Sequence, residues 1–174
     1  MGENAGVQIS AKSDYALRAM CALAAAADDP GGAPVKAGVI AEAHQIPRTF
    51  LDAILIDLRH AGLVESVRGP AGGHRLARPA YAVTVADVMR VIDGPLALVH
   101  GNRPESMRYD GPAAGLQDVW VAARAALRAV LEWTTLEHIV TGRLPTAVTA
   151  LSGEARSWTS VWPPPESGET PRRA

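Results

Sequence analysis

Two short helical patterns with one tight break between them lie within residues 35–62 and constrain the fold more than any other feature. The first pattern has a short apolar face, formed by Val39, Ile40 and Ala43. The second begins near Pro47, which suits the first turn of a helix, and ends at Gly62, which suits a helix C-cap. Its apolar residues recur at helical spacing: Leu51, Ile54, Leu55 and Leu58. The segment therefore predicts a helix-turn-helix.

A basic, glycine-rich hairpin is predicted directly after the second helix. Leu63, Val64 and Val67 suit a short strand. The glycines expected to supply the positive φ angles of a tight reversal are Gly69, Gly72 and Gly73. Basic side chains gather there with no acid among them: Arg68, His74, Arg75 and Arg78. This order of elements is typical of a winged helix-turn-helix, whose wing lies on DNA with arginine in the minor groove. Taken alone, the hairpin is equally an ordinary solvated one.

Capping residues divide the rest of the chain. Ser10 is expected to begin a helix over 11–27, and Thr84 a short helix over 85–92. Residues 94–115 are rich in glycine, proline and polar residues and predict a loop. After the long helix that follows, Thr134 to Glu137 resembles a capping box for a further short helix to Val140. The chain beyond Gly142 is expected to be unstructured.

The long helix, from Leu116 to about Trp133, carries a narrow apolar seam at spacings of four and three. The seam consists of Leu116, Trp120, Ala123, Leu127 and Val130. Such a seam packs a helix either against its own domain or against a partner helix. We favour a dimer, because a helix-turn-helix protein usually needs two half-sites.

Composition sets the remaining limits. A chain of 174 residues with 48% hydrophobic content supports one compact domain with an appendage. The net charge is −1, so any affinity for DNA must come from local clusters of basic residues. No apolar run approaches the roughly 18 residues of a membrane span, and residues 1–7 show no secretory signal. A single cysteine excludes an internal disulfide, so we expect a cytoplasmic protein without membrane contact.

Three segments resemble the Rrf2-type family of bacterial transcriptional regulators: Ile9 to Met20, Leu58 to Gly73, and Thr84 to Gly94. With the long helix included, the resemblance covers roughly residues 8 to 141, and the middle segment is the most specific. It implies a mainly α (α+β) fold. The expected parts are a winged helix-turn-helix DNA-binding domain (8–82), a short helix and effector loop (83–115), a dimerisation helix (116–141) and a flexible tail (142–174).

The best-known chemistry of this family is an iron-sulfur cluster held by three cysteines in the segment that matches residues 100–115. This chain has no cysteine there, and its only thiol, Cys21, is expected to be a buried small hydrophobe. Asp14 matches a carboxylate that ligates the cluster in some relatives, but a carboxylate without thiolates does not hold one. The five histidines are dispersed, so we expect no metal and no cofactor. The glycine run lies between two strands rather than before a helix, so no phosphate loop or enzyme is indicated.

The resemblance also implies a set of DNA contacts. Arg68 matches the arginine that enters the minor groove, and Thr49 stands where a serine contacts DNA. Phe50 replaces a tyrosine and Ala53 a glutamine, while Asp52 is able to accept from cytosine. The further expected contacts are Lys12, Tyr15, Arg48, Gly72, Gly73, His74 and Arg75. Effector residues are expected in the loop: His100, Met107 and Tyr109.

The sequence thus predicts a regulator that binds double-stranded DNA as a homodimer, acts as a repressor on an inverted-repeat operator, and responds to a small-molecule effector. The alternative is a protein-interaction module that uses the same fold to regulate a metabolic enzyme or another partner.

Overall fold

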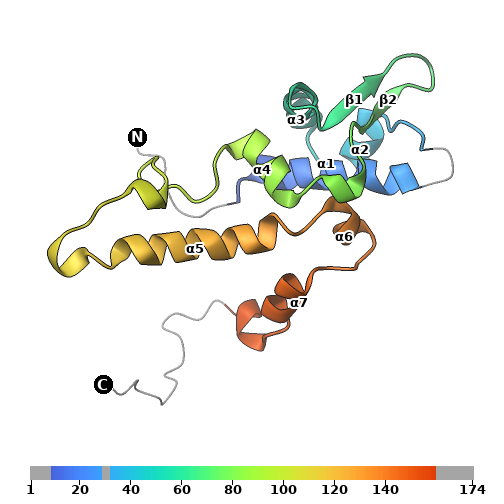
Figure 1. The fold of residues 1–174 in the computed structure, drawn as a ribbon. Coiled ribbons are helices and arrows are strands. Elements are labelled where there is room, and N and C mark those ends of the chain that lie inside the picture. Colours follow the sequence, from blue (N-terminus) through green and yellow to red (C-terminus); the bar gives the residue numbers. More distant parts are fainter. Residues whose placement is uncertain (1–8, 29–31, 160–174) are drawn as a thin grey trace.

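The computed structural model describes residues 9–28 and 32–159 and is mainly helical, with one two-stranded antiparallel sheet (Figure 1). The helices are α1 (Ala11–Asp28), α2 (Ala37–Ala43), α3 (Arg48–His60), α4 (Val85–Asp93), α5 (Leu116–Leu131), α6 (Leu136–Val140) and α7 (Thr146–Ser152). The strands are β1 (Val64–Val67) and β2 (Gly73–Leu76). Short 3-10 helices are η1 (Ala80–Ala82), η2 (Pro104–Ser106), η3 (Gly111–Ala113) and η4 (Ala155–Trp158). The predicted winged helix-turn-helix class is confirmed.

Helix α1 is the centre of the core. The Oγ of Ser10 accepts from the backbone N–H of Ser13 at 3.0 Å, which caps the helix as predicted. Alanines on the inner face let other elements approach closely, and α1 packs against α3, α4, α6 and β2. The fully buried side chains around it include Met20, Leu23, Ile40, Leu51, Ile54, Leu58, Leu63 and Leu136. One cluster therefore holds the helix-turn-helix, the hairpin and α6 together.

The pair α2–α3 follows the predicted order, with two corrections. Ile40 of α2 is buried but Val39 is 56% exposed, because a helix of seven residues meets the core along one narrow side. Pro47 is the N-cap of α3 rather than part of its first turn. Gly62, one residue past the C-cap, has a φ of +69° and reverses the chain into β1 as a glycine in this place commonly does.

Two capping boxes tie the elements after the hairpin. Thr84 accepts from the N–H of Asp87 at 3.1 Å, and the Asp87 carboxylate accepts from the N–H of Thr84 at 3.0 Å. At α6 the cap is Thr135 with His138, so the predicted box from Thr134 is shifted by one residue. The Thr134 hydroxyl instead donates to the carbonyl of Val130 at 2.6 Å.

Helix α5 extends past the helix-turn-helix body, and the loop of residues 94–115 leads to its far end (Figure 1). Leu127 and Leu131 pack on a small cluster formed by Val85, Ala86, Met89 and Leu96. The other half of α5 exposes apolar side chains: Leu116 (38%), Val119 (55%) and Trp120 (38%). Among the described residues, none of the helices has the length and apolar character that crossing a bilayer requires.

The prediction of an unstructured chain after Gly142 is wrong for residues 146–158. They form α7 and η4, and α7 packs against α5. The indole N–H of Trp158 donates to the carbonyl of Ser152 at 2.6 Å and fixes η4 on the end of α7. Residues 160–174, which carry the rest of the predicted tail, lie outside the described residues.

Candidate nucleic-acid interface

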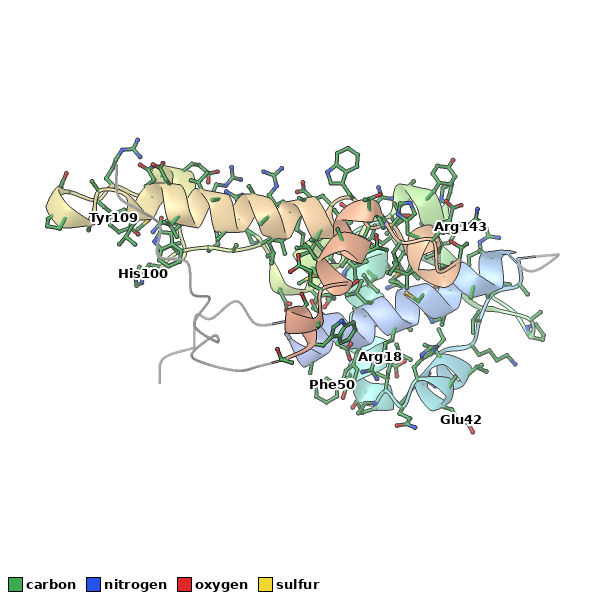
Figure 2. The ribbon with its side chains drawn as sticks, turned by 90° about the horizontal axis from the view of Figure 1, so that it is seen from below. Arg18, Glu42, Phe50, His100, Tyr109 and Arg143 are labelled. Carbon is green, nitrogen blue, oxygen red and sulfur yellow. The ribbon has the colours of Figure 1, made fainter. Side chains whose placement is uncertain are left out.

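The outer face of α3 presents the residues that sequence analysis assigned to DNA. Thr49, Phe50 and Ala53 are exposed, while the other side of the helix is buried in the core. Phe50 is 56% exposed and meets the ring of Tyr15 edge-on, with 6.5 Å between the ring centroids. The guanidinium of Arg18 lies over the same Tyr15 ring, and Figure 2 shows Arg18 and Phe50 on the same part of the molecule.

Acidic side chains position the basic groups of this face. Arg48 donates from Nε to both carboxylate oxygens of Asp52, at 2.8 and 3.0 Å. Lys12 of α1 reaches across to Asp57 of α3, with 2.8 Å between Nζ and Oδ2. Both pairs are about half exposed, so their net contribution to stability is small. Their effect is to orient the cations at the surface of α3.

The hairpin forms the predicted wing, with Val64 paired to Leu76 and Val67 to Gly73. Only Gly69 of its three tip glycines has a positive φ, at +109°, so the expectation for Gly72 and Gly73 was wrong. Positions 72 and 73 require glycine because other backbone atoms lie too close for a Cβ. A Cβ on Gly72 would lie 2.2 Å from the carbonyl oxygen of Val67, and one on Gly73 would lie 2.5 Å from that of Val35.

The charges on the wing differ from the prediction in one respect. Arg75 forms a cross-strand ion pair with Glu65, so an acid does lie among the basic residues. Arg68 is exposed at the tip and pairs with no carboxylate in the part of the chain that the structure describes. The backbone of His74 exchanges two 2.8 Å hydrogen bonds with Val35, which anchors the wing to the segment before α2.

A cavity of about 260 Å³ separates α3 from the wing. Its lining includes Asp52 and Ile56 of α3, His74 of β2, and two residues that sequence analysis missed, Arg59 and Ser66. Arg59 follows Asp52 and Ile56 at helical spacing, which was the available signal for it. Burial lowers the pKa of His74 more than the nearby Asp52 raises it, which favours the neutral imidazole.

Of the three expected effector residues, His100 lines a cavity that the other two do not line. Figure 2 places His100 and Tyr109 at the far end of α5 from Phe50. His100 lines an apolar cavity of about 290 Å³ together with Leu98, Val99, Pro104 and Trp120. Met107 and Tyr109 lie outside that lining.

The donor set does not fit an iron-sulfur cluster, which needs three or four thiolate or equivalent ligands. The single cysteine, Cys21, is half-buried against the core, and burial raises the pKa of its thiol. Asp14 forms an ion pair with Arg18 at 2.6 Å, one turn along α1. Within residues 9–28 and 32–159, no three His, Cys, Asp or Glu side chains gather in the way a metal ion requires.

Comparison with known proteins agrees with this geometry. The Rrf2 family model, described as an iron-dependent transcriptional regulator, matches residues 9–142. Rv1287 of Mycobacterium tuberculosis, assigned by name to the HTH-type transcriptional regulators, is 46% identical over 155 residues, which are 89% of this chain and 94% of the relative.

Two solved structures show the same fold at substantial identity. CymR, the global cysteine regulator of Bacillus subtilis, superposes with a TM-score of 0.67 at 33% identity, covering 79% of this chain and 98% of CymR. IscR of T. potens gives a TM-score of 0.63 at 31% identity, covering 79% of this chain and 89% of IscR. Rv1287, CymR and IscR are all HTH-type transcriptional regulators by name. The chain therefore belongs to the Rrf2 family of winged helix-turn-helix, DNA-binding transcriptional regulators.

Proposed function

We propose that this regulator is a homodimeric repressor of an inverted-repeat operator and acts on DNA in the bacterial cytoplasm. The observation that carries the proposal is the shared orientation of α3 and the wing. Both lie on the side of the body opposite to α5 (Figure 1), so one DNA duplex reaches both while the exposed apolar side chains of α5 stay free for a second copy. Two copies of α3 then enter successive major grooves about 34 Å apart.

The contacts divide into base readout and backbone positioning. Thr49 and Ala53 face the base edges, where Ala53 contacts a thymine methyl, and Arg48 reaches guanine or phosphate beside Asp52. Arg68 enters the minor groove, while Lys12 and Tyr15 hold phosphates. The remaining wing contacts come from the backbone of Gly72 and Gly73 and from the side chains of His74 and Arg75.

The dimer seam uses the outer half of α5. Leu116, Trp120 and Ala123 are exposed in the single chain, whereas Leu127 and Val130 are half-buried. Leu127 packs on its own domain through the α4 cluster, so the predicted seam divides into two parts. The second copy covers the part nearer the effector loop.

We further propose that the regulator works without an iron-sulfur cluster, because one half-buried thiol does not supply the ligands. The protein instead detects its signal through a small-molecule effector that binds at the loop before α5.

The test is binding to a labelled duplex from the region upstream of the protein's own gene, measured by fluorescence anisotropy. The wild-type chain should bind it more tightly than unrelated DNA, with affinity that falls steeply as salt rises. Arg68→Ala should weaken binding by about 1 to 3 kcal/mol without unfolding the protein, because the side chain is exposed. Arg143→Ala removes an exposed arginine away from this face and should bind as the wild type does. Binding no tighter than to unrelated DNA, or full affinity in Arg68→Ala, would refute the proposal.

A further inference from the structure

A third cavity, of about 450 Å³, lies where the end of α4 meets the effector loop and α5. Arg90 and the turn after α4 form one wall, Arg103 and Glu105 another, and Arg124 and Arg128 of α5 the third. Its volume falls within the range of small-ligand sites, roughly 300 to 1,000 Å³. It is separate from the cavity between α3 and the wing, and it shares Arg124 with the apolar cavity that His100 lines.

The charges around this cavity do not balance. Four arginines line it against one carboxylate, Glu105, while Glu132 lies behind Arg90 and Arg128 and pairs with both. Four positive and two negative groups leave a net charge of +2. Hydrogen bonds from arginine lower the pKa of both carboxyl groups, so both count as charged at neutral pH. Arg103 pairs with no carboxylate among the described residues.

Arg124 shows where an anion would be held. Its side chain is only 16% exposed, and one nitrogen, Nη1, donates to both oxygens of Glu105 at 2.7 and 2.5 Å. The Nε of the same guanidinium is buried and has no acceptor. A buried donor without an acceptor is costly, and carboxylates usually take two nitrogens of an arginine at once. Glu105 is 53% exposed and accepts from Arg124 only through Nη1. An oxyanion that accepts from Nε as well would therefore displace the Glu105 carboxylate from Arg124.

We propose that this arginine cavity binds a small organic dianion, a dicarboxylate or a phosphate monoester, in exchange for Glu105. Displacing Glu105 leaves four arginines against Glu132 alone, a net charge of +3, so the cavity favours a dianion over a singly charged anion, and its volume favours a small molecule. The dianion's role as an effector rests on the proposed function in DNA binding. The binding of the dianion to the cavity does not depend on that function.

A chain of contacts leads from the cavity to the DNA-reading helix. The cavity wall at Gly94 follows Asp93, whose carboxylate accepts from the hydroxyls of Ser10 and Ser13 at 2.6 to 2.9 Å. Between these serines, Lys12 pairs with Asp57 of α3. A ligand that draws the end of α4 toward α5 therefore moves the N-terminus of α1 and, through Lys12, changes how α3 is presented.

Isothermal titration calorimetry on the full chain without DNA tests the site, with succinate and glycerol 3-phosphate as the two dianions. At least one should bind saturably with one site per chain, and the one that binds more tightly shows whether the site prefers a dicarboxylate or a phosphate monoester. Acetate, with a single charge, should bind at least tenfold more weakly. Arg103→Gln should weaken binding at least tenfold and should fold normally, because Arg103 is exposed and unpaired among the described residues. Arg143→Gln is the matched control and should bind as the wild type does.

Arg124→Lys adds a test of geometry. It keeps the charge but loses the planar fork, so binding should weaken at least tenfold although the net charge is unchanged. Absence of saturable binding by either dianion up to about 1 mM, or equal binding by Arg103→Gln, overturns the site. In the anisotropy assay, the bound dianion should shift the operator Kd at least tenfold for the wild type and not for Arg103→Gln. Saturable binding that leaves a measurable operator Kd unchanged overturns the effector role.

Discussion

Replacing Gly73 by alanine should detach the wing from the segment before α2. An ideal Cβ at this position lies 2.5 Å from the carbonyl oxygen of Val35 and 2.7 Å from its carbonyl carbon. Real Cβ atoms essentially never come within 3.0 Å of another heavy atom, and both partners are backbone atoms, so the two segments must separate. Their separation breaks the two 2.8 Å hydrogen bonds that Val35 exchanges with His74. Each bond contributes about 0.5 to 1.5 kcal/mol, so we expect a loss of about 1 to 3 kcal/mol.

Urea denaturation followed by tryptophan fluorescence measures this loss, with Gly115→Ala as the control. Gly115 has a φ of −74° and open space around its Cβ position, so alanine there should change stability by no more than about 0.5 kcal/mol. Operator affinity of Gly73→Ala should fall as well, because the wing that carries Arg68 is no longer anchored to the segment before α2. A Gly73→Ala variant as stable as Gly115→Ala would show that the close approach to Val35 has no energetic consequence.

Four further outcomes are expected. Thr84→Ala should lower the free energy of unfolding by about 0.5 to 2 kcal/mol in urea denaturation, because it removes the cap of α4; an unchanged midpoint contradicts this. NMR titration should give His74 a midpoint below the ordinary value of about 6.5, since burial favours the neutral ring. The stability that the neutral His74 ring contributes is then present above about pH 6.5 and is lost as the pH falls through the midpoint. A midpoint above the ordinary value would contradict this prediction and reverse the pH dependence. Val119→Asp should turn a dimer into a folded monomer in sedimentation experiments, because Val119 lies beside the proposed seam and, being 55% exposed, does not stabilise the single chain; a wild-type protein that is monomeric at micromolar concentration would refute the dimer seam. Protein purified without oxygen should be colourless, Cys21→Ser should bind DNA as the wild type does, and Cys21 should react slowly with thiol reagents because burial raises its pKa; stoichiometric iron would overturn the cluster-free proposal.

Local chemistry explains which elements were predictable from sequence. The cap at Thr84 and the buried side of α3 depend on residues within one or two turns of each other, so spacing alone reveals them. The helical period also places Phe50 on the outer face, and the family resemblance supplies Arg68.

Features that depend on distant partners were missed or misread. The glycine at 73 is needed because Val35 lies against it, and nothing in the hairpin sequence indicates this neighbour. The arginine cavity joins residues from 90 to 128 along the chain, so no single segment displays it. Helix α7 was missed because Thr146 to Ser152 is short and lacks a side-chain cap, and its contact with α5 is a tertiary one.

The two backbone bonds that join α6 to the start of α4 have a further consequence. Val85 donates to the carbonyl of Thr134, and Leu136 donates to that of Val83, both at 2.9 Å. The stretch between them begins with α4, which packs on α1 and α3, then continues away from the body as the loop and α5, and returns to the body at this junction. Closing a longer loop between fixed ends costs only about 0.6 kcal/mol for each doubling of its length. Lengthening or exchanging residues 97–113 should therefore leave the DNA-reading half folded, and such a junction allows regulators to acquire new sensing segments without redesigning their DNA-binding surface.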